Sequence, residues 1–134
     1  MRGIADTGFL VAFANRRDEY FSWAHALAEN VEDPLLTCEA VLAETAFHLR
    51  DSALALAMVE KGLVRLAFDV ESQRVKLSEL ARRYADRRPD LADLCLIRMS
   101  ELNPKLSILT VDGDFRVYRR NRRETIPVIM PPGL

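Results

Sequence analysis

The sequence predicts an α/β fold of three layers, α/β/α, with a mainly parallel sheet of four to five strands. Short apolar runs typical of strands alternate with longer segments whose apolar residues recur at helical spacing. Strands that alternate with helices imply β–α–β crossovers, which place a parallel sheet between two layers of helices. The chain has 134 residues, 49 % hydrophobic and 29 % charged, which suits a single domain over residues 1–134.

The first part of the chain predicts one strand and two helices. Residues 2–6 (RGIAD) form a short apolar run that ends in an acid, and residues 7–15 (TGFLVAFAN) begin a helix after it. Residues 18–30 (DEYFSWAHALAEN) carry apolar side chains at helical spacing.

The middle of the chain predicts a strand followed by two helices. Residues 34–38 (PLLTC) predict a short strand. Residues 39–50 (EAVLAETAFHLR) are apolar around most of the helix circumference, which predicts a buried helix. Residues 51–62 (DSALALAMVEKG) begin with an Asp or Ser cap and end in glycine, which are signals of a helix start and stop.

The last part predicts three strands and two helices. Residues 63–68 (LVRLAF) predict a strand, residues 71–86 an amphipathic helix, and residues 89–103 a further helix. Residues 106–111 (LSILTV) and 126–130 (IPVIM) predict two more strands of the same sheet.

Charge and cysteine usage narrow the class of protein. The net charge of −1 argues against a generic nucleic-acid coat, although arginines, which suit phosphate contacts, greatly outnumber lysines. No apolar run approaches the roughly 18 residues of a membrane span, and the N-terminus lacks a signal-peptide pattern, so we expect a cytoplasmic protein without membrane contact. Cys38 and Cys95 lie in apolar patterns without a CxxC, which predicts reduced core thiols rather than a zinc site.

Three acids follow predicted strands at their carboxyl ends, where open parallel sheets bind ligands. Asp6 ends the first strand, and Asp112 and Asp114 follow the strand ILTV. Each has a structural alternative, because Asp6 suits a helix cap and Asp112–Gly113–Asp114 suits a turn. The stretch DGDF lacks the further ligands of an EF-hand.

Three further acids lie on predicted helices. Glu44 stands on a largely apolar face, and positions 40, 41, 47 and 48 around it hold no Lys or Arg. A buried Glu needs a partner, so either a distant Arg or a metal ion is expected. Asp90 and Asp93 share a helix face, although the sequence PDLAD also suits a helix cap.

Carboxylates gathered at one rim point to a hard cation. Two like charges about 4 Å apart repel by about 1 kcal/mol in water and by about 4 kcal/mol at an effective dielectric of about 20. Such a cluster requires either protons or a bound cation. Oxygen ligands without His or Cys select Mg²⁺ or Mn²⁺, an ion that can activate water and orient a phosphodiester.

In their order and spacing, the motifs ADTGFLVA, VLAETAF, DLADLCLI and ILTVDGDF resemble the PIN domain, in particular the VapC-type toxins of toxin–antitoxin pairs. The resemblance runs over essentially the whole chain. It implies a PIN-like parallel sheet surrounded by helices, acids around Mg²⁺ or Mn²⁺, and endonucleolytic cleavage of RNA. A cognate antitoxin protein is implied as a partner.

The resemblance also assigns roles to individual residues. The catalytic and metal-binding acids that it implies are Asp6, Glu44, Asp93 and Asp112. The accessory residues that it implies are Thr7, Thr110, Asp90 and Asp114. One departure is Gly113, because family members often carry a basic or polar residue there, and this concerns the role of Asp114 rather than that of Asp112.

Two surfaces are candidates for macromolecular partners. Arginines crowd the segment after the last acid, and we expect Arg116, Arg119 and Arg120 to contact the RNA backbone. Phe115 suits core packing better than base stacking. The aromatics of the N-terminal helices suit either the core or a groove for a partner segment or a homodimer face; they are Phe9, Phe13, Tyr20, Phe21 and Trp23.

Two other functions stay open at this point. A catalytically silent PIN-like module would bind RNA or a protein, but an incomplete acid set would favour it and the set here is complete. A receiver domain or aspartyl-phosphate phosphatase also places an Asp at a strand end. Neither explains Glu44, and the phosphatase would need a second Asp where Gly8 stands.

Overall fold

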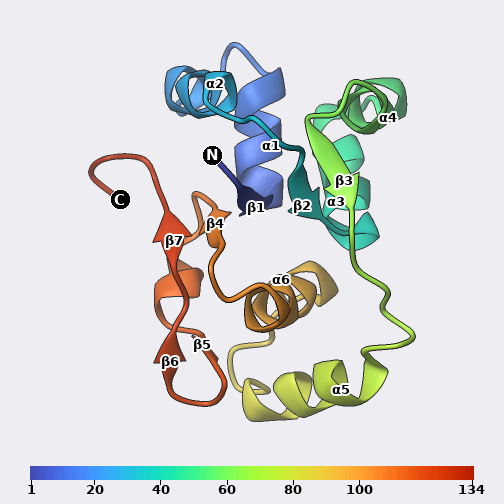
Figure 1. Cartoon of the computed structure of the whole chain (residues 1–134), viewed down its shortest axis with the longest axis vertical. Coiled ribbons are helices and arrows are strands. Elements are labelled where there is room, and N and C mark those ends of the chain that lie inside the picture. Colours follow the sequence, from blue (N-terminus) through green and yellow to red (C-terminus); the bar gives the residue numbers. More distant parts are fainter.

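The structure, a computed structural model, describes residues 1–134 and alternates strands with helices as the sequence predicts (Figure 1). The strands are β1 (Gly3–Ala5), β2 (Leu35–Thr37), β3 (Val64–Leu66), β4 (Ser107–Leu109), β5 (Arg119–Arg120), β6 (Glu124–Thr125) and β7 (Val128–Ile129). The helices are α1 (Thr7–Ala14), α2 (Phe21–Glu29), α3 (Glu39–Leu49), α4 (Ser52–Glu60), α5 (Arg74–Arg83), α6 (Leu91–Leu102) and the 3₁₀ helix η1 (Gly113–Arg116).

Five of the strands form one parallel sheet in the order β3-β2-β1-β4-β7. Ile4 of β1 is in register with Leu36 of β2 on one side and with Ile108 of β4 on the other. The chain leaves β1 towards β2 and later returns to β4, so a topological switch point lies between β1 and β4. This order differs from the 2-1-3-4-5 order of receiver domains, which removes that alternative.

Helices flank the sheet, as predicted. Helix α1 packs against α2 and α3, and α3 packs against α4. Helix α6 contacts β1 and β4, and α5 lies beside α6 at one end of the molecule (Figure 1). The helices that follow the acid-bearing strands are α1, after β1, and η1, after β4. Both helices, and α6, which carries Asp93, border the carboxyl ends of these strands.

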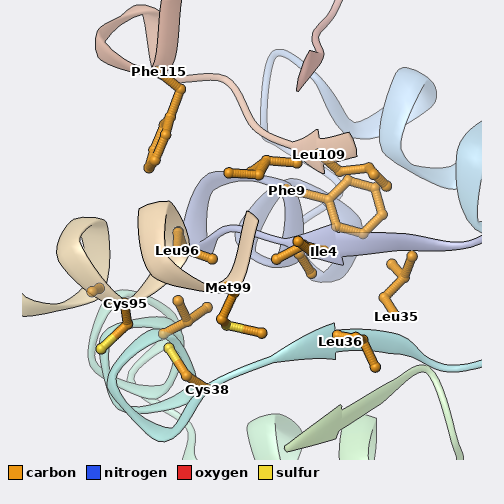
Figure 2. Close-up of a cluster of buried hydrophobic side chains, with 14 of the residues drawn as sticks. Ile4, Phe9, Leu35, Leu36, Cys38, Cys95, Leu96, Met99, Leu109 and Phe115 are labelled. Atoms are coloured by element: carbon orange, nitrogen blue, oxygen red, sulfur yellow. The ribbon is translucent and has the colours of Figure 1, made fainter. Parts of the chain in front are cut away.

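The core lies between the sheet and these helices (Figure 2). Ile4 of β1, Phe9 of α1 and Leu96 of α6 are completely buried in it. Cys38 and Cys95 are buried there as free thiols, as predicted, and Figure 2 shows both in the core. A fully buried side chain such as Ile4, Phe9 or Leu96 contributes about 1.5–3 kcal/mol to stability.

The helix over residues 39–50 is less buried than predicted. Only Val41 and Thr45 of α3 are buried, and Phe47 is 76 % exposed. Its apolar residues surround the helix, but its neighbours α1, α4 and α6 leave the side that carries Phe47 exposed. The expectation of a buried helix was wrong because composition alone does not indicate how many neighbours a helix has.

A small antiparallel hairpin, β5–β6, is an element that the sequence did not predict. Arg120 of β5 is in register with Glu124 of β6. The arginine-rich segment has none of the apolar alternation by which strands are recognised. Its order comes from side-chain contacts of Arg120 to the end of α6, described below.

Candidate active site

One open cavity of about 540 Å³ lies at the carboxyl ends of β1 and β4, next to the switch point. Such a crevice is where open α/β sheets bind ligands. No Lys or Arg lines it. Its acidic lining residues are Asp6, Asp18, Glu19, Glu44, Asp90, Asp93 and Asp112, and we call it the acidic cavity.

Asp6 is fixed by hydrogen bonds from two segments. It is 6 % exposed and caps α1, and its carboxylate accepts the Thr7 backbone N–H at 2.6 Å. The other oxygen accepts the Thr110 hydroxyl at 2.6 Å, and Thr110 Oγ1 in turn accepts the Asp112 backbone N–H at 2.9 Å. The capping role is therefore confirmed, and the same contacts tie the ends of β1 and β4 together.

Gly8 allows this close approach of α1 to the end of β4. A Cβ atom at Gly8 would collide with the side chain of Val111. The first turn of α1 can therefore lie against the segment that carries Asp112 only if residue 8 lacks a side chain. Sequence reasoning did not identify this requirement.

Glu44 reaches the acidic cavity from α3. Its Oε1 accepts the Thr7 hydroxyl at 2.7 Å. No Arg or Lys forms an ion pair with it, so the alternative of a distant Arg partner was wrong. Burial raises the pKa of Glu44 and the nearby Asp90 carboxyl raises it further, whereas the Thr7 hydrogen bond lowers it.

Asp90 and Asp93 start α6 and have different local roles. Asp90 is the N-cap, and its carboxylate accepts the Asp93 backbone N–H at 2.8 Å, which confirms the capping alternative for Asp90. The Asp93 carboxyl takes no part in capping. It lines the acidic cavity and lies 3.5 Å from the hydroxyl of Tyr118, which donates to it.

Asp112 and Asp114 separate at η1. Asp112 caps η1 by accepting the Asp114 backbone N–H at 2.9 Å, so the turn interpretation is confirmed, and Asp112 also lines the acidic cavity. Asp114 is exposed, does not line the cavity, and forms an ion pair with Arg87 at 3.6 Å. The structure thus brings Asp112 to the other acids and leaves Asp114 outside.

Repulsion and burial perturb the protonation of the two central acids. Burial raises the pKa of Asp6 to about 6, against the hydrogen bonds from Thr110 and Thr7, which lower it. Burial also raises the pKa of Asp93 to about 8, and the carboxylates of Asp90, Asp6, Asp112 and Glu44 add to this. The ionised cluster is therefore electrostatically unfavourable without a cation.

Two of the three arginines expected to contact RNA are occupied within the chain. Arg120 is 4 % exposed and donates to the Ser100 carbonyl and hydroxyl at 3.0 Å, which excludes the contact with RNA that the sequence suggested. Arg119 donates to three backbone carbonyls, those of residues 116 to 118. Arg116 is exposed.

Sequence reasoning missed several residues that border the acidic cavity. Asp18, Glu19 and Tyr20 line it from the loop between α1 and α2, and Tyr118 reaches Asp93 from the segment after η1. The only signal in the sequence was the polar stretch RRDEY. Which face of a loop meets a site depends on tertiary packing, so this stretch could not be assigned.

The other aromatics of the N-terminal helices pack mainly within the chain. Phe9 is buried and meets Trp23 edge-on at 5.8 Å between ring centroids. Phe13 stacks on His25 at 4.6 Å, and Phe21 lies 4.2 Å from the same ring. Phe115 is fully buried, as the core interpretation expected.

The donor set of the acidic cavity fits a hard divalent cation. It presents carboxylate oxygens from five separate segments, no Cys, Lys or Arg lines it, and His48 is its one lining residue with an imidazole nitrogen. A donor set made mainly of carboxylate oxygens suits Mg²⁺ or Mn²⁺. No three of the acids converge closely enough in this structure to enclose an ion, so an ion would draw their flexible side chains together.

Comparisons with known proteins agree with the fold. Residues 4–121 match the family described as the PIN domain. The structure resembles the crystal structure of Mycobacterium tuberculosis VapC20, described as a sarcin-ricin loop cleaving toxin, with a TM-score of 0.74 and 20 % identity over 95 % of this chain and 100 % of that one. The comparison with curated proteins found no match. Because the family match spans most of the sequence, this chain belongs to the PIN domain family.

Proposed function

We propose that this PIN domain is a metal-dependent endoribonuclease that cleaves RNA phosphodiester bonds with Mg²⁺ or Mn²⁺. The observation that carries the proposal is the acidic cavity itself. Seven acids line it without any Lys or Arg, two of them with pKa values raised to about 6 and about 8. A cluster that is unfavourable when empty is what a divalent cation stabilises.

The residues divide into those that would hold the ion and those that position them. Asp6, Glu44, Asp93 and Asp112 would hold it, directly or through water. Thr110 orients Asp6, Thr7 orients Glu44, and Asp90 fixes the first turn that carries Asp93. The bound ion would activate water and stabilise charge on the phosphate. Asp114, which pairs with Arg87, is proposed to act outside this set.

We further propose that the protein is the toxin of a type II toxin–antitoxin pair and works as a homodimer. The motif resemblance and the likeness to a toxin structure support the first part. Exposed apolar side chains support protein partners, since Phe47 on α3 and Leu56 on α4 are 76 % and 54 % exposed. No helix is long and apolar enough to cross a membrane.

The decisive experiment is cleavage of total RNA by the wild type and by Asp93→Asn, each with Mg²⁺, Mn²⁺ or EDTA. The expected result is discrete fragments made only by the wild type with metal. Asp86→Asn is the matched control, because Asp86 is exposed and does not line the acidic cavity. End-mapping of the fragments would identify the target RNA.

Two outcomes would contradict the proposal. Equal cleavage by Asp93→Asn and the wild type would show that the acidic cavity takes no part in the cleavage reaction. Absence of cleavage together with absence of Mn²⁺ binding in calorimetry would favour a catalytically silent binding module. Growth arrest on induction of the wild type, but not of Asp93→Asn, tests the toxin role separately.

A further inference from the structure

A second polar cavity, of about 230 Å³, lies between α5, α6 and the turn of the β5–β6 hairpin. None of its lining residues lines the acidic cavity. Only one of them, Leu80, is apolar. The lining residues are Lys76, Glu79, Leu80, Arg83, Arg98, Glu101, Asn121 and Arg122, and we call this cavity the arginine pocket.

The arginine pocket has two cations that the chain does not neutralise. Within it, Lys76 pairs with Glu79 at 3.7 Å, and Arg98 pairs with Glu101 at 3.0 Å. The side chains of Arg83 and Arg122 make no ion pair. They also make no hydrogen bond within the chain, although both face the same cavity from different segments. Their charge is therefore available to an anion.

The chain holds the hairpin turn that carries Arg122 in a fixed position. Arg120 donates to the Pro104 carbonyl at 3.1 Å and to Glu124 at 2.6 Å, and the Asn121 backbone N–H donates to Glu101 at 2.7 Å. Asn121 and Arg122 have left-handed φ angles of 48° and 73°. Positive φ angles of this kind belong to the tight turns of β-hairpins.

A continuous line of contacts, which we call the seam, connects this pocket to the acidic cavity. Next to Asp112, Asp114 pairs with Arg87 at 3.6 Å. Further along, the Tyr84 hydroxyl accepts the Arg119 backbone N–H at 2.8 Å. The end of α5 and the segment from η1 to the hairpin therefore run side by side, and Figure 1 shows the hairpin turn beside that end of α5.

The distance along this seam suits a short stretch of nucleic acid. Asp93 and Glu101 stand on the same helix, α6, eight residues apart, which is about 12 Å along its axis. A strand whose scissile phosphate lies at the acidic cavity would reach the arginine pocket within a few nucleotides. Arg87 lies between the two cavities, and its pairing with Asp114 keeps it at the rim.

We propose that the arginine pocket binds backbone phosphates of the RNA strand that enters the acidic cavity, with Arg83 and Arg122 as the contacts. The inference rests on the proposed function. Guanidinium groups bind phosphate oxygens in a bidentate manner. An acidic protein segment is the less suitable occupant, because protein interfaces need an apolar centre and this pocket offers one apolar residue.

The test measures RNA binding without cleavage. A fluorescein-labelled single-stranded RNA of mixed sequence is titrated in EDTA with the wild type and with the double variant Arg83→Gln/Arg122→Gln, over a series of salt concentrations. Fluorescence anisotropy gives the affinity and its salt dependence. This sequence-independent electrostatic term is measurable even when the natural target is unknown.

Two control variants keep the result interpretable. Arg2→Gln/Arg65→Gln removes the same charge from another polar cavity, of about 160 Å³, beside the start of β1. Arg83→Lys/Arg122→Lys keeps the charge in the arginine pocket. Circular dichroism of every variant checks that the fold is intact.

We expect the glutamine pair at Arg83 and Arg122 to bind RNA about tenfold more weakly, with the slope of log affinity against log salt smaller by about 1.4, as two lost phosphate contacts on a single strand predict. The lysine pair should stay within about twofold of the wild type because it keeps the charge in the arginine pocket. The Arg2/Arg65 control should do so because its arginines line a different cavity, outside the proposed path of the RNA. Equal loss in the Arg2/Arg65 control would overturn the inference. So would wild-type binding of a polyglutamate peptide in preference to RNA.

Failure of the inference is distinguishable from failure of the proposed function. If the wild type cleaves RNA with Mn²⁺ but its affinity does not depend on Arg83 and Arg122, the nuclease proposal stands and the arginine pocket does not. If binding depends on these arginines but the wild type neither cleaves RNA nor binds Mn²⁺, the pocket stands and the nuclease proposal fails.

Discussion

Replacement of Asp93 by Asn should stabilise the metal-free protein, and by more at high pH than at low pH. The change keeps the shape of the side chain and removes one charge from a cavity lined by seven acids. The only hydrogen bond that the carboxyl makes is the long contact of 3.5 Å with the Tyr118 hydroxyl. Little is therefore lost except the repulsion that acts on the ionised carboxylate.

The size of the effect follows from the pKa. Burial and four neighbouring carboxylates raise the pKa of Asp93 from 3.8 to about 8. At about 1.4 kcal/mol per pKa unit, this difference corresponds to roughly 6 kcal/mol. Asp93 is only half-buried in an open cavity, so solvent screening reduces the expected gain to about 2 kcal/mol.

The sign and the pH window follow from linkage. Between about pH 4 and pH 8 the folded wild type binds more protons at Asp93 than the unfolded chain does, so its stability falls as pH rises through this window. Asn does not titrate. The two proteins should therefore be equally stable near pH 4, and Asp93→Asn should be more stable by the full amount at pH 8.

Urea unfolding in EDTA, followed by the fluorescence of Trp23, measures this difference at several pH values. Asp86→Asn again serves as the control, and its stability should match the wild type at every pH. If Asp93→Asn were no more stable than the wild type at pH 8, or if its gain did not change with pH, the description of Asp93 as a destabilised carboxylate would be refuted. The same variant should have lost RNA cleavage.

Three further predictions concern the ion, the glycine contact and the hairpin. In differential scanning fluorimetry, Mg²⁺ or Mn²⁺ should raise the melting temperature of the wild type by a larger amount at pH 8 than at pH 5. Asp93→Asn should lose most of this rise. An equal rise in both proteins would place the ion elsewhere. In urea unfolding, Gly8→Ala should lower the free energy of unfolding by about 1–3 kcal/mol, because its Cβ collides with Val111. Adding Val111→Ala to the same chain should recover part of this loss. Arg120→Met should lower the free energy of unfolding by about 2–4 kcal/mol, because it leaves Ser100 and Glu124 without their hydrogen-bond donor. Proteolysis between β5 and β6 should then become faster. Unchanged proteolysis would contradict the anchoring role of Arg120.

The sequence predicts the sheet and most of the helices because each element carries its own periodic signal. The strands at 106–111 and 34–38 were expected to be longer than β4 and β2, since apolar residues continue past the last paired residue. The hairpin could not be predicted, because β5 and β6 are held by the contacts of Arg120 rather than by apolar alternation. The exposure of Phe47 depends on which helices lie nearby, and no local pattern encodes that.

The sequence predicted those residues of the candidate site whose side-chain direction follows from their position along a strand or on an apolar helix face. Asp6 and Asp112 follow β1 and β4, so the sheet alone brings them to one edge, and Glu44 was identified because a carboxylate on an apolar face needs a reason. Asp18 and Tyr118 come from irregular segments, and only the folded chain brings them to the cavity. Arg120 was misassigned because a run of arginines does not show which member is buried.

The capping contacts explain how the fold tolerates a site that works against its stability. Asp6, Asp90 and Asp112 each cap a helix start, so each carboxylate accepts a backbone N–H that would otherwise lack a partner. A capping interaction typically contributes about 1 kcal/mol, which offsets part of the repulsion. Asp93 accepts no backbone N–H, and its pKa is raised to about 8, against about 6 for the capped Asp6. Asp93 is therefore where a bound cation should recover the most free energy. Burial also raises the pKa of Glu44, although the Thr7 hydrogen bond lowers it, so Glu44→Gln should gain less stability without metal than Asp93→Asn and should also lose part of the stabilisation that metal provides.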